Sequence, residues 1–123
     1  MFNRFSIGKK TWGSSKAACE LVNGKLVEIK FELMNQQVAD KGYEIYGEDV
    51  AWMGVNDIES ESNWVYASTG TSITYSNWRP GSATSGGTSY PNDCAFLHLN
   101  TTVGHGLWQS DLCGNPRWFI CDI

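Results

Sequence analysis

Near the middle of the chain, residues 52–55 read Trp52-Met53-Gly54-Val55, a nearly continuous apolar run. Short apolar runs of this kind are typical of strands that are buried on both faces. We therefore predict a central strand here. The residues before the run favour helices and those after it favour short strands, so the predicted fold class is α+β.

The N-terminal half carries the signals of two helices. Thr11 is a suitable N-cap, and Asn23-Gly24 is a suitable end, because glycine accepts the left-handed conformation that often follows a helix. Alternation of apolar and polar residues before Thr11 predicts a half-buried strand. The elements expected in this half are strands over 2–7 and 26–29 and helices over 12–22 and 32–41, the second helix closed by Gly42.

The C-terminal half is a series of short strands interrupted by one long segment. Residues 81–93 are dominated by Gly, Ser and Thr and show no periodicity. A loop of that length inside a compact domain is usually functional. The strands expected around it cover 63–66, 73–75, 95–99, 107–109 and 118–122.

Length and charge exclude several classes of function. The 123 residues suffice for a single domain, residues 1–123. The net charge is −4 and the nine Lys and Arg are scattered, which argues against a nucleic-acid partner. No apolar run approaches the roughly 20 residues that span a bilayer, so no membrane insertion is expected. No catalytic motif is found, and we predict a protein that is not an enzyme.

The cysteines indicate an oxidising compartment. An even number of four, with no C-x-x-C pair, predicts two disulfides and a secreted or extracellular protein. The spacing alone leaves three pairings open. Met1-Phe2-Asn3-Arg4 leads straight into alternating sequence, so we expect the chain to start after any signal peptide. The four residues are Cys19, Cys94, Cys113 and Cys121.

Several short motifs, in order along the chain, resemble the C-type lectin-like domain, in particular the short, collectin-like form. The resemblance covers nearly the whole chain. It implies the α+β lectin fold with two helices, antiparallel sheets and a long ligand-binding loop, and it selects the nested disulfides Cys19–Cys121 and Cys94–Cys113. The motifs are Ala18-Cys19, Gly24-x-Leu26, Trp52-Met53-Gly54-Val55, Tyr75-Ser76-Asn77-Trp78-Arg79-Pro80-Gly81, Asp93-Cys94, Trp108-x-x-x-x-Cys113 and Phe119-Ile120-Cys121.

The usual sugar site of that family is altered here. The family binds sugar through a calcium ion whose ligands come from an E-P-N or Q-P-D tripeptide, a Glu before the Cys, and a W-N-D motif. This chain has Ser82-Ala83-Thr84, Asn92 and Trp108-Gln109-Ser110 at those places. Because the number of charged ligands sets calcium affinity, calcium-bridged mannose or galactose binding does not carry over.

Two sets of candidate residues remain. One expectation is that Tyr90-Pro91-Asn92, followed by Asp93, acts as a displaced version of the Pro-containing motif, and that Ser110-Asp111, with a bulge in the strand, stands in for the Asn-Asp of W-N-D. An auxiliary calcium site, as in collectins, would use Asp57, Glu61 and Asp93 with a carbonyl of Asn92; a simply solvated acidic loop is the alternative. The predicted carbohydrate-binding residues are Tyr90, Asn92, Asp93, Gln109 and Asp111, and the predicted metal ligands are Asp57, Glu61, Asn92 and Asp93.

The leading hypothesis is thus a carbohydrate-binding lectin that recognises glycans or glycoproteins, with a role in innate recognition. Modest affinity per site would favour a homo-oligomer. The alternative is a lectin-like protein-interaction module that has lost sugar binding. Among the remaining residues, Trp52, Trp78 and Trp108 are expected in the core, His98 on an outward-facing strand position, and His105 in a solvated turn.

Overall fold

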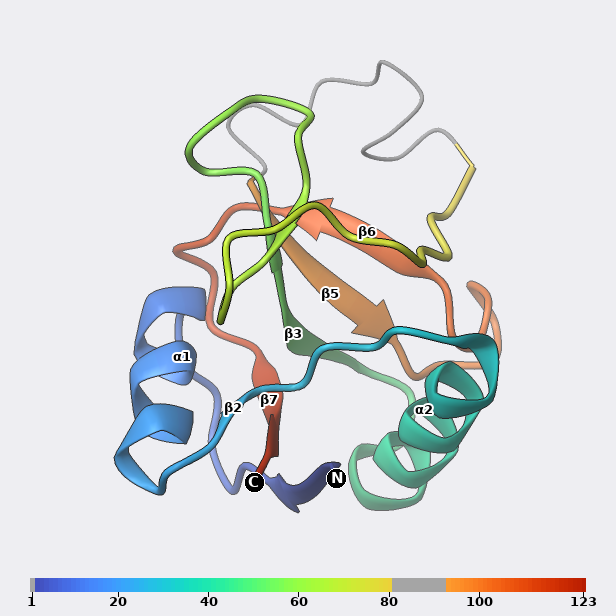
Figure 1. Cartoon of the computed structure of the whole chain (residues 1–123). Helices are drawn as coiled ribbons and strands as arrows, with labels where there is room; N and C mark the ends of the chain where they lie inside the picture. Colours follow the sequence, from blue (N-terminus) through green and yellow to red (C-terminus); the bar gives the residue numbers. More distant parts are fainter. Residues whose placement is uncertain (1, 81–92) are drawn as a thin grey trace.

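A computed structural model describes residues 2–80 and 93–123. Its strands form one sheet, with helix α1 on one side and helix α2 on the other (Figure 1). The two chain ends lie together at the edge remote from the long loops (Figure 1). The elements are β1 Phe2–Phe5, α1 Trp12–Leu21, β2 Lys25–Leu26, α2 Glu32–Tyr46, β3 Val50–Asn56, β4 Val65–Tyr66, β5 Cys94–His98, β6 Trp108–Asp111 and β7 Trp118–Asp122.

Strand β3 is the centre of the sheet, as its apolar run predicts. It pairs antiparallel with β5 and parallel with β7, and all seven of its residues are buried. The main path of the sheet is β1-β7-β3-β5-β6, with β2 beside β7 and β4 beside β3. The fold is therefore the α+β arrangement expected, and both predicted disulfides, Cys19–Cys121 and Cys94–Cys113, are present.

The core divides into two layers because neighbouring residues on a strand face opposite sides. Trp52 points to the α1 side, where it joins Trp12 and Phe96. Met53 points to the α2 side, where it joins Val38 and other apolar residues. Of the three tryptophans expected in the core, Trp52 and Trp108 are fully buried and Trp78 packs, partly buried, against the α2-side layer.

Two glycines allow close packing that the sequence did not reveal, and for Gly42 this replaces the predicted role at the end of a helix. Gly42 does not close α2, which runs on to Tyr46. A Cβ at Gly42 would lie 2.6 Å from Leu99 Cδ2, so this glycine allows close packing rather than termination. A Cβ at Gly54 would lie 2.6 Å from the carbonyl oxygen of Leu26, and the Gly54 N–H donates to Val27 O at 2.7 Å.

Other differences concern strand length. The strand expected over 26–29 is reduced to Lys25–Leu26, and that over 63–66 to Val65–Tyr66. No strand forms over 73–75, where only an isolated bridge between Val65 and Ser72 is found nearby. In these segments side chains pack in the core while the backbone bonds irregularly, so apolar pattern alone overestimates strand length. Within the described residues, no helix is long and apolar enough to cross a bilayer.

Candidate functional site

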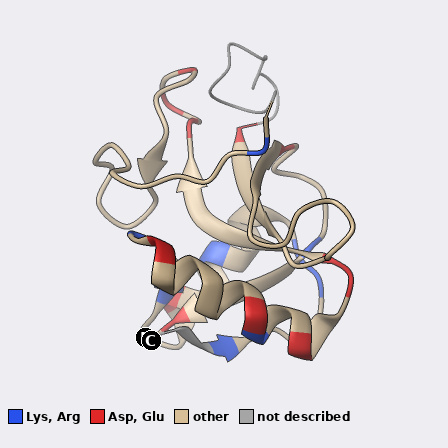
Figure 2. Cartoon of the chain, turned by 90° about the vertical axis from the view of Figure 1, so that its right-hand side faces the viewer, with Lys and Arg blue, Asp and Glu red and all other residues tan. Residues whose placement is uncertain are grey.

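Three carboxylates meet at one end of the sheet. One oxygen each from Asp57, Glu61 and Asp93 lies within 4.8 Å of the other two. Asp57 follows β3 and Asp93 precedes β5, and because these strands are antiparallel neighbours, the end of one meets the start of the other. The Asp57 N–H donates to Asp93 O at 3.0 Å. Acidic segments are visible at this end of the sheet in Figure 2.

The loop after β3 is folded around the Asp57 carboxylate. Asp57 is only 1% exposed, and its Oδ2 accepts a hydrogen bond from Ser62 N at 2.8 Å. Asn56 Oδ1 accepts one from Ile58 N at 3.1 Å. Ser62 has a φ of 67°, a left-handed conformation that a serine adopts at a cost. The loop thus holds the Asp57 carboxylate in place before any ligand arrives.

The pKa of Asp93 reflects both its burial and the nearby acids. Burial is the main cause that raises its pKa to about 6, followed by a hydrogen bond with Asp57 and by the negative charges of Asp57 and Glu61. Asp93 Oδ1 is buried and accepts no hydrogen bond from the described residues. Hard oxygen ligands, crowded and negatively charged, are the donor set that calcium prefers. The arrangement therefore suits a divalent cation.

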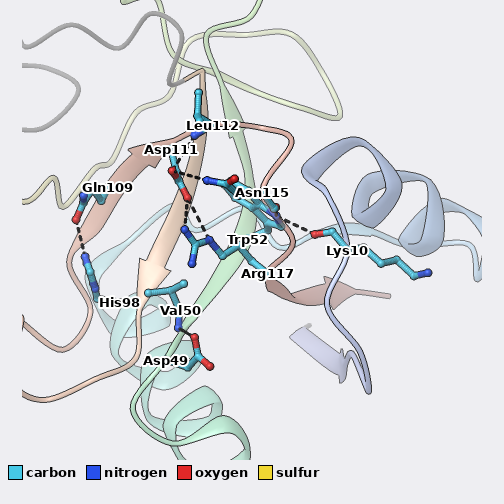
Figure 3. A network of polar contacts seen from close by, with 10 residues as sticks. All are labelled: Lys10, Asp49, Val50, Trp52, His98, Gln109, Asp111, Leu112, Asn115 and Arg117. Atoms are coloured by element: carbon cyan, nitrogen blue, oxygen red, sulfur yellow. Dashed lines mark hydrogen bonds and ion pairs between the residues drawn. The ribbon is translucent and has the colours of Figure 1, made fainter.

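The predicted sugar-binding residues fall into three groups. Tyr90 and Asn92 lie outside the described residues. Asp93 belongs to the acid cluster. Gln109 and Asp111 lie on β6, in the network of polar contacts that Figure 3 shows. Asp111 is opposite Cys94 in the β5–β6 register. Because Cys94 directly follows Asp93, this register brings β6 close to the acid cluster.

The side chains of Gln109 and Asp111 are both hydrogen-bonded to other residues of this chain. Gln109 Oε1 accepts from His98 Nε2 at 2.8 Å (Figure 3). It also accepts from Arg79 Nη1 at 3.1 Å. Asp111 Oδ2 accepts from Arg117 Nη2 at 2.6 Å and from Nε at 3.1 Å. Its Oδ1 accepts from Leu112 N and Asn115 Nδ2. A sugar that contacts these side chains must exchange or share these bonds.

The two histidines are more closely held than the sequence predicts. The outward-facing position expected for His98 is wrong, because the side chain is buried, with 5% exposure, beside Phe96 and Gln109. Burial lowers its pKa, and the charge of Arg79 lowers it further, while the Gln109 bond acts in the opposite direction. His105 contacts Asp40 Oδ1 and Leu99 O, each at 2.8 Å, rather than solvent alone.

Sequence reasoning found the three acids but missed the residues that arrange them. Ser62 and Asn56 carried no signal beyond a polar loop. Arg79 and His98 lie on separate segments whose meeting at Gln109 depends on the tertiary fold, and the adjacency of Arg117 and Asp111 depends on the turn between β6 and β7.

Comparison with known proteins agrees with this architecture. The family model for the lectin C-type domain matches residues 8–123. The mouse low affinity immunoglobulin epsilon Fc receptor is 30% identical over 109 residues, covering 89% of this chain and 29% of the receptor. Pig pulmonary surfactant-associated protein D is 27% identical over 116 residues, 94% of this chain and 29% of that protein. The chain thus spans less than a third of either relative.

Solved structures give the same result. The carbohydrate-recognition domain of the human scavenger receptor C-type lectin superposes with a TM-score of 0.79 at 30% identity, covering 95% of this chain and 85% of that one. The cow carbohydrate-recognition domain of CD23, solved with a GlcNAc2Man3 oligosaccharide, superposes at 0.73 with 26% identity, covering 97% and 84%. These are binding domains and not enzymes. With a match over nearly its whole length, the chain belongs to the C-type lectin domain family.

Proposed function

We propose that this domain binds glycans at the end of the sheet where Asp57, Glu61 and Asp93 converge, with a calcium ion held by these carboxylates. The observation that carries the proposal is their convergence within 4.8 Å. Support also comes from the relatives, since the matched domains of the scavenger receptor and CD23 are described as carbohydrate-recognition domains.

The described residues fit calcium in charge and in the kind of ligand atom. Calcium takes six to eight oxygen ligands from flexible loops. Three carboxylates supply the charge, and the buried Oδ1 of Asp93 accepts no hydrogen bond from the described residues, which leaves it available to a cation. The carbonyl of Asn92 and water would complete the shell. Bound calcium would neutralise the crowded charges and tie the loop after β3 to the start of β5.

In this proposal the sugar contacts protein side chains rather than the calcium ion of the usual family site. The proposed contacts are Tyr90, Asn92, Asp93, Gln109 and Asp111. Gln109 and Asp111 would contribute by sharing hydrogen bonds that they already make with Arg79 and Arg117. We further propose that the partners are glycoproteins and that the protein is extracellular, which the two disulfides support. We also propose a homo-oligomer, because several copies would multiply a modest affinity per site.

A protein-interaction module is the second candidate. Ile58, next to Asp57, is 53% exposed, and Leu112, next to Asp111, is 42% exposed. Exposed apolar surface is one mark of a protein-interaction site. A protein partner would bury them, whereas a sugar would use mainly the polar groups around them.

A glycan array with calcium, and again with a chelator, tests the function. The proposal expects binding to defined glycans that weakens on chelation. Binding that survives chelation would leave the lectin function and reject the calcium mechanism. Absence of glycan binding in both conditions would reject the lectin function and favour the protein-interaction module.

The metal ligands are tested separately by Asp57→Asn. This change keeps the shape that accepts the Ser62 N–H but removes a charged ligand. Calcium at about 100 times its Kd should stabilise the unaltered protein by about 2.7 kcal/mol, measured as a thermal shift against EDTA. We expect Asp57→Asn to lose most of that shift. The matched control is Glu59→Gln, on the same loop but outside the acid cluster, which should keep it.

A further inference from the structure

A pocket that contains none of the three acids lies between α1, β7 and the segment that joins β1 to α1. Its volume is about 250 Å³. Ala18 on α1 and Val22, the residue that follows the helix, form one wall. Phe119 and Cys121, two residues apart on β7, form another. Phe5 and Ile7 complete an apolar lining.

The backbone holds this pocket open. Ser6 N donates to Phe119 O at 3.0 Å, and Lys10 pairs with Arg117 through two bonds of 3.0 Å, so both ends of residues 6–10 are fixed. The Ser6 side chain is engaged with Phe119 N and Tyr46 rather than filling the space. Ala18, the smallest side chain of the apolar wall, leaves room that a larger residue would occupy.

Ile7 at the edge of this pocket is fully exposed, at 101%. A single exposed aliphatic residue is ordinary on a protein surface. Its position on the lining of an apolar pocket is different, since a ligand in the pocket would cover it together with Val22 and Phe5. The apolar surface therefore favours a hydrocarbon-like group.

The charge of the pocket selects the other end of the ligand. Among the described residues that line it, the ionisable side chains are Arg4 and Lys10, both cationic, although the whole chain has a net charge of −4. Both are exposed, and neither forms an ion pair with a described residue. A guanidinium and an ammonium beside an apolar pocket complement a carboxylate or phosphate attached to a hydrocarbon chain.

We propose that this pocket binds a small amphipathic anion, its hydrocarbon chain between α1 and β7 and its acidic group at Arg4 and Lys10. A second copy of the chain fits less well, because a symmetric contact would bring two sets of these cations together. The pocket shares no residue with the proposed glycan site, so the two proposals stand or fall separately.

Isothermal titration with decanoate below its micelle concentration tests the proposal. Decanol and decyltrimethylammonium, which share the hydrocarbon chain, serve as the uncharged and cationic controls. We expect saturable binding of decanoate, at least about tenfold tighter than of decyltrimethylammonium, because the cations select charge. Amide chemical shifts of Ile7, Ala18 and Val22 should move with the same binding curve. Equal binding of all three ligands, or shifts elsewhere only, would overturn the proposal.

Variants locate the site and separate its two halves. Ala18→Leu fills the pocket, and we expect at least about a tenfold loss of decanoate binding. Arg4→Glu with Lys10→Glu reverses the charges on the exposed surface, and should remove the preference for decanoate over decyltrimethylammonium even if Ala18→Leu fails to fold. Lys41→Glu and Lys30→Glu, which make the same charge change away from the pocket, should leave binding unchanged. Retention of the preference in the Arg4 and Lys10 variant would reject the proposed role of these cations. In every variant that folds, glycan and calcium binding should be retained.

Discussion

Asp93 couples folding of this domain to pH in the direction opposite to most aspartates. Its pKa in the folded chain is raised to about 6 by burial and by the neighbouring acids. The folded state therefore binds more protons than the unfolded state between about pH 4 and pH 6, and stability falls as pH rises through that window. A cation that replaces the proton restores it, because metal and proton compete for the carboxylate.

Asp93→Asn tests this coupling. Without calcium, the neutral amide should remove the Asp93 contribution to the loss of stability between pH 4 and pH 7. Urea unfolding at these two pH values, in the presence of EDTA, measures the difference. An unchanged pH profile in Asp93→Asn would show that the acids are not crowded as described. The same variant should lose the calcium-dependent thermal shift.

His98 contributes in the opposite direction. Burial lowers its pKa from the ordinary value near 6.5, so the unfolded state takes up the proton more readily. Its contribution is present above about pH 6.5 and is lost as pH falls below that value. We expect His98→Gln to flatten the stability profile on this acid side, measured by urea unfolding at pH 7.5 and 5.5. A profile that keeps its full slope would contradict the burial of a neutral imidazole beside Gln109.

At the scale of elements, the approach of residues 26–27 to β3 depends on Gly54. A Cβ there would lie 2.6 Å from Leu26 O, a backbone atom that cannot move independently. Gly54→Ala should therefore destabilise the protein by about 1–3 kcal/mol in urea unfolding. Gly13→Ala, in α1 with no atom within 4 Å of the added Cβ, is the matched control and should be neutral or slightly stabilising. Equal effects of the two changes would reject the steric argument.

The sequence predicted elements better than their ends. Thr11 caps α1 as expected, with its side chain accepting from Ser14 N, because an N-cap is a local interaction. The predicted end of α2 was wrong because Gly42 is required by close packing against Leu99, a residue distant in sequence. The acids Asp57, Glu61 and Asp93 were identified through the family resemblance, which carries long-range information. The arrangement of Gln109 with Arg79 and His98 was not predicted, because it too depends on contacts between residues distant in sequence.

At the scale of the whole molecule, the two disulfides have different roles. Cys19–Cys121 bridges a separation of 102 residues and Cys94–Cys113 one of 19. By loop entropy, replacing the first pair with alanine should cost about 4–5 kcal/mol and the second about 3 kcal/mol. The shorter bridge holds the start of β5, next to Asp93, so we expect its loss to weaken the calcium response in particular. Urea unfolding and calcium titration of both variants measure this; an equal calcium response in the two would contradict it.

The adjacency of the chain ends has a mechanical consequence. Phe2 lies opposite Asp122 in the pairing of β1 with β7, and Cys121, next to Asp122, is bonded to Cys19 on α1. Tension applied to the two ends would peel β1 from β7 and then reach the covalent bridge, which bears the load. The chain between the two cysteines, 102 positions apart and including the three acids, would be shielded from that force. Pulling the two ends of the domain apart should therefore leave the acid cluster folded for as long as the Cys19–Cys121 bond stays intact.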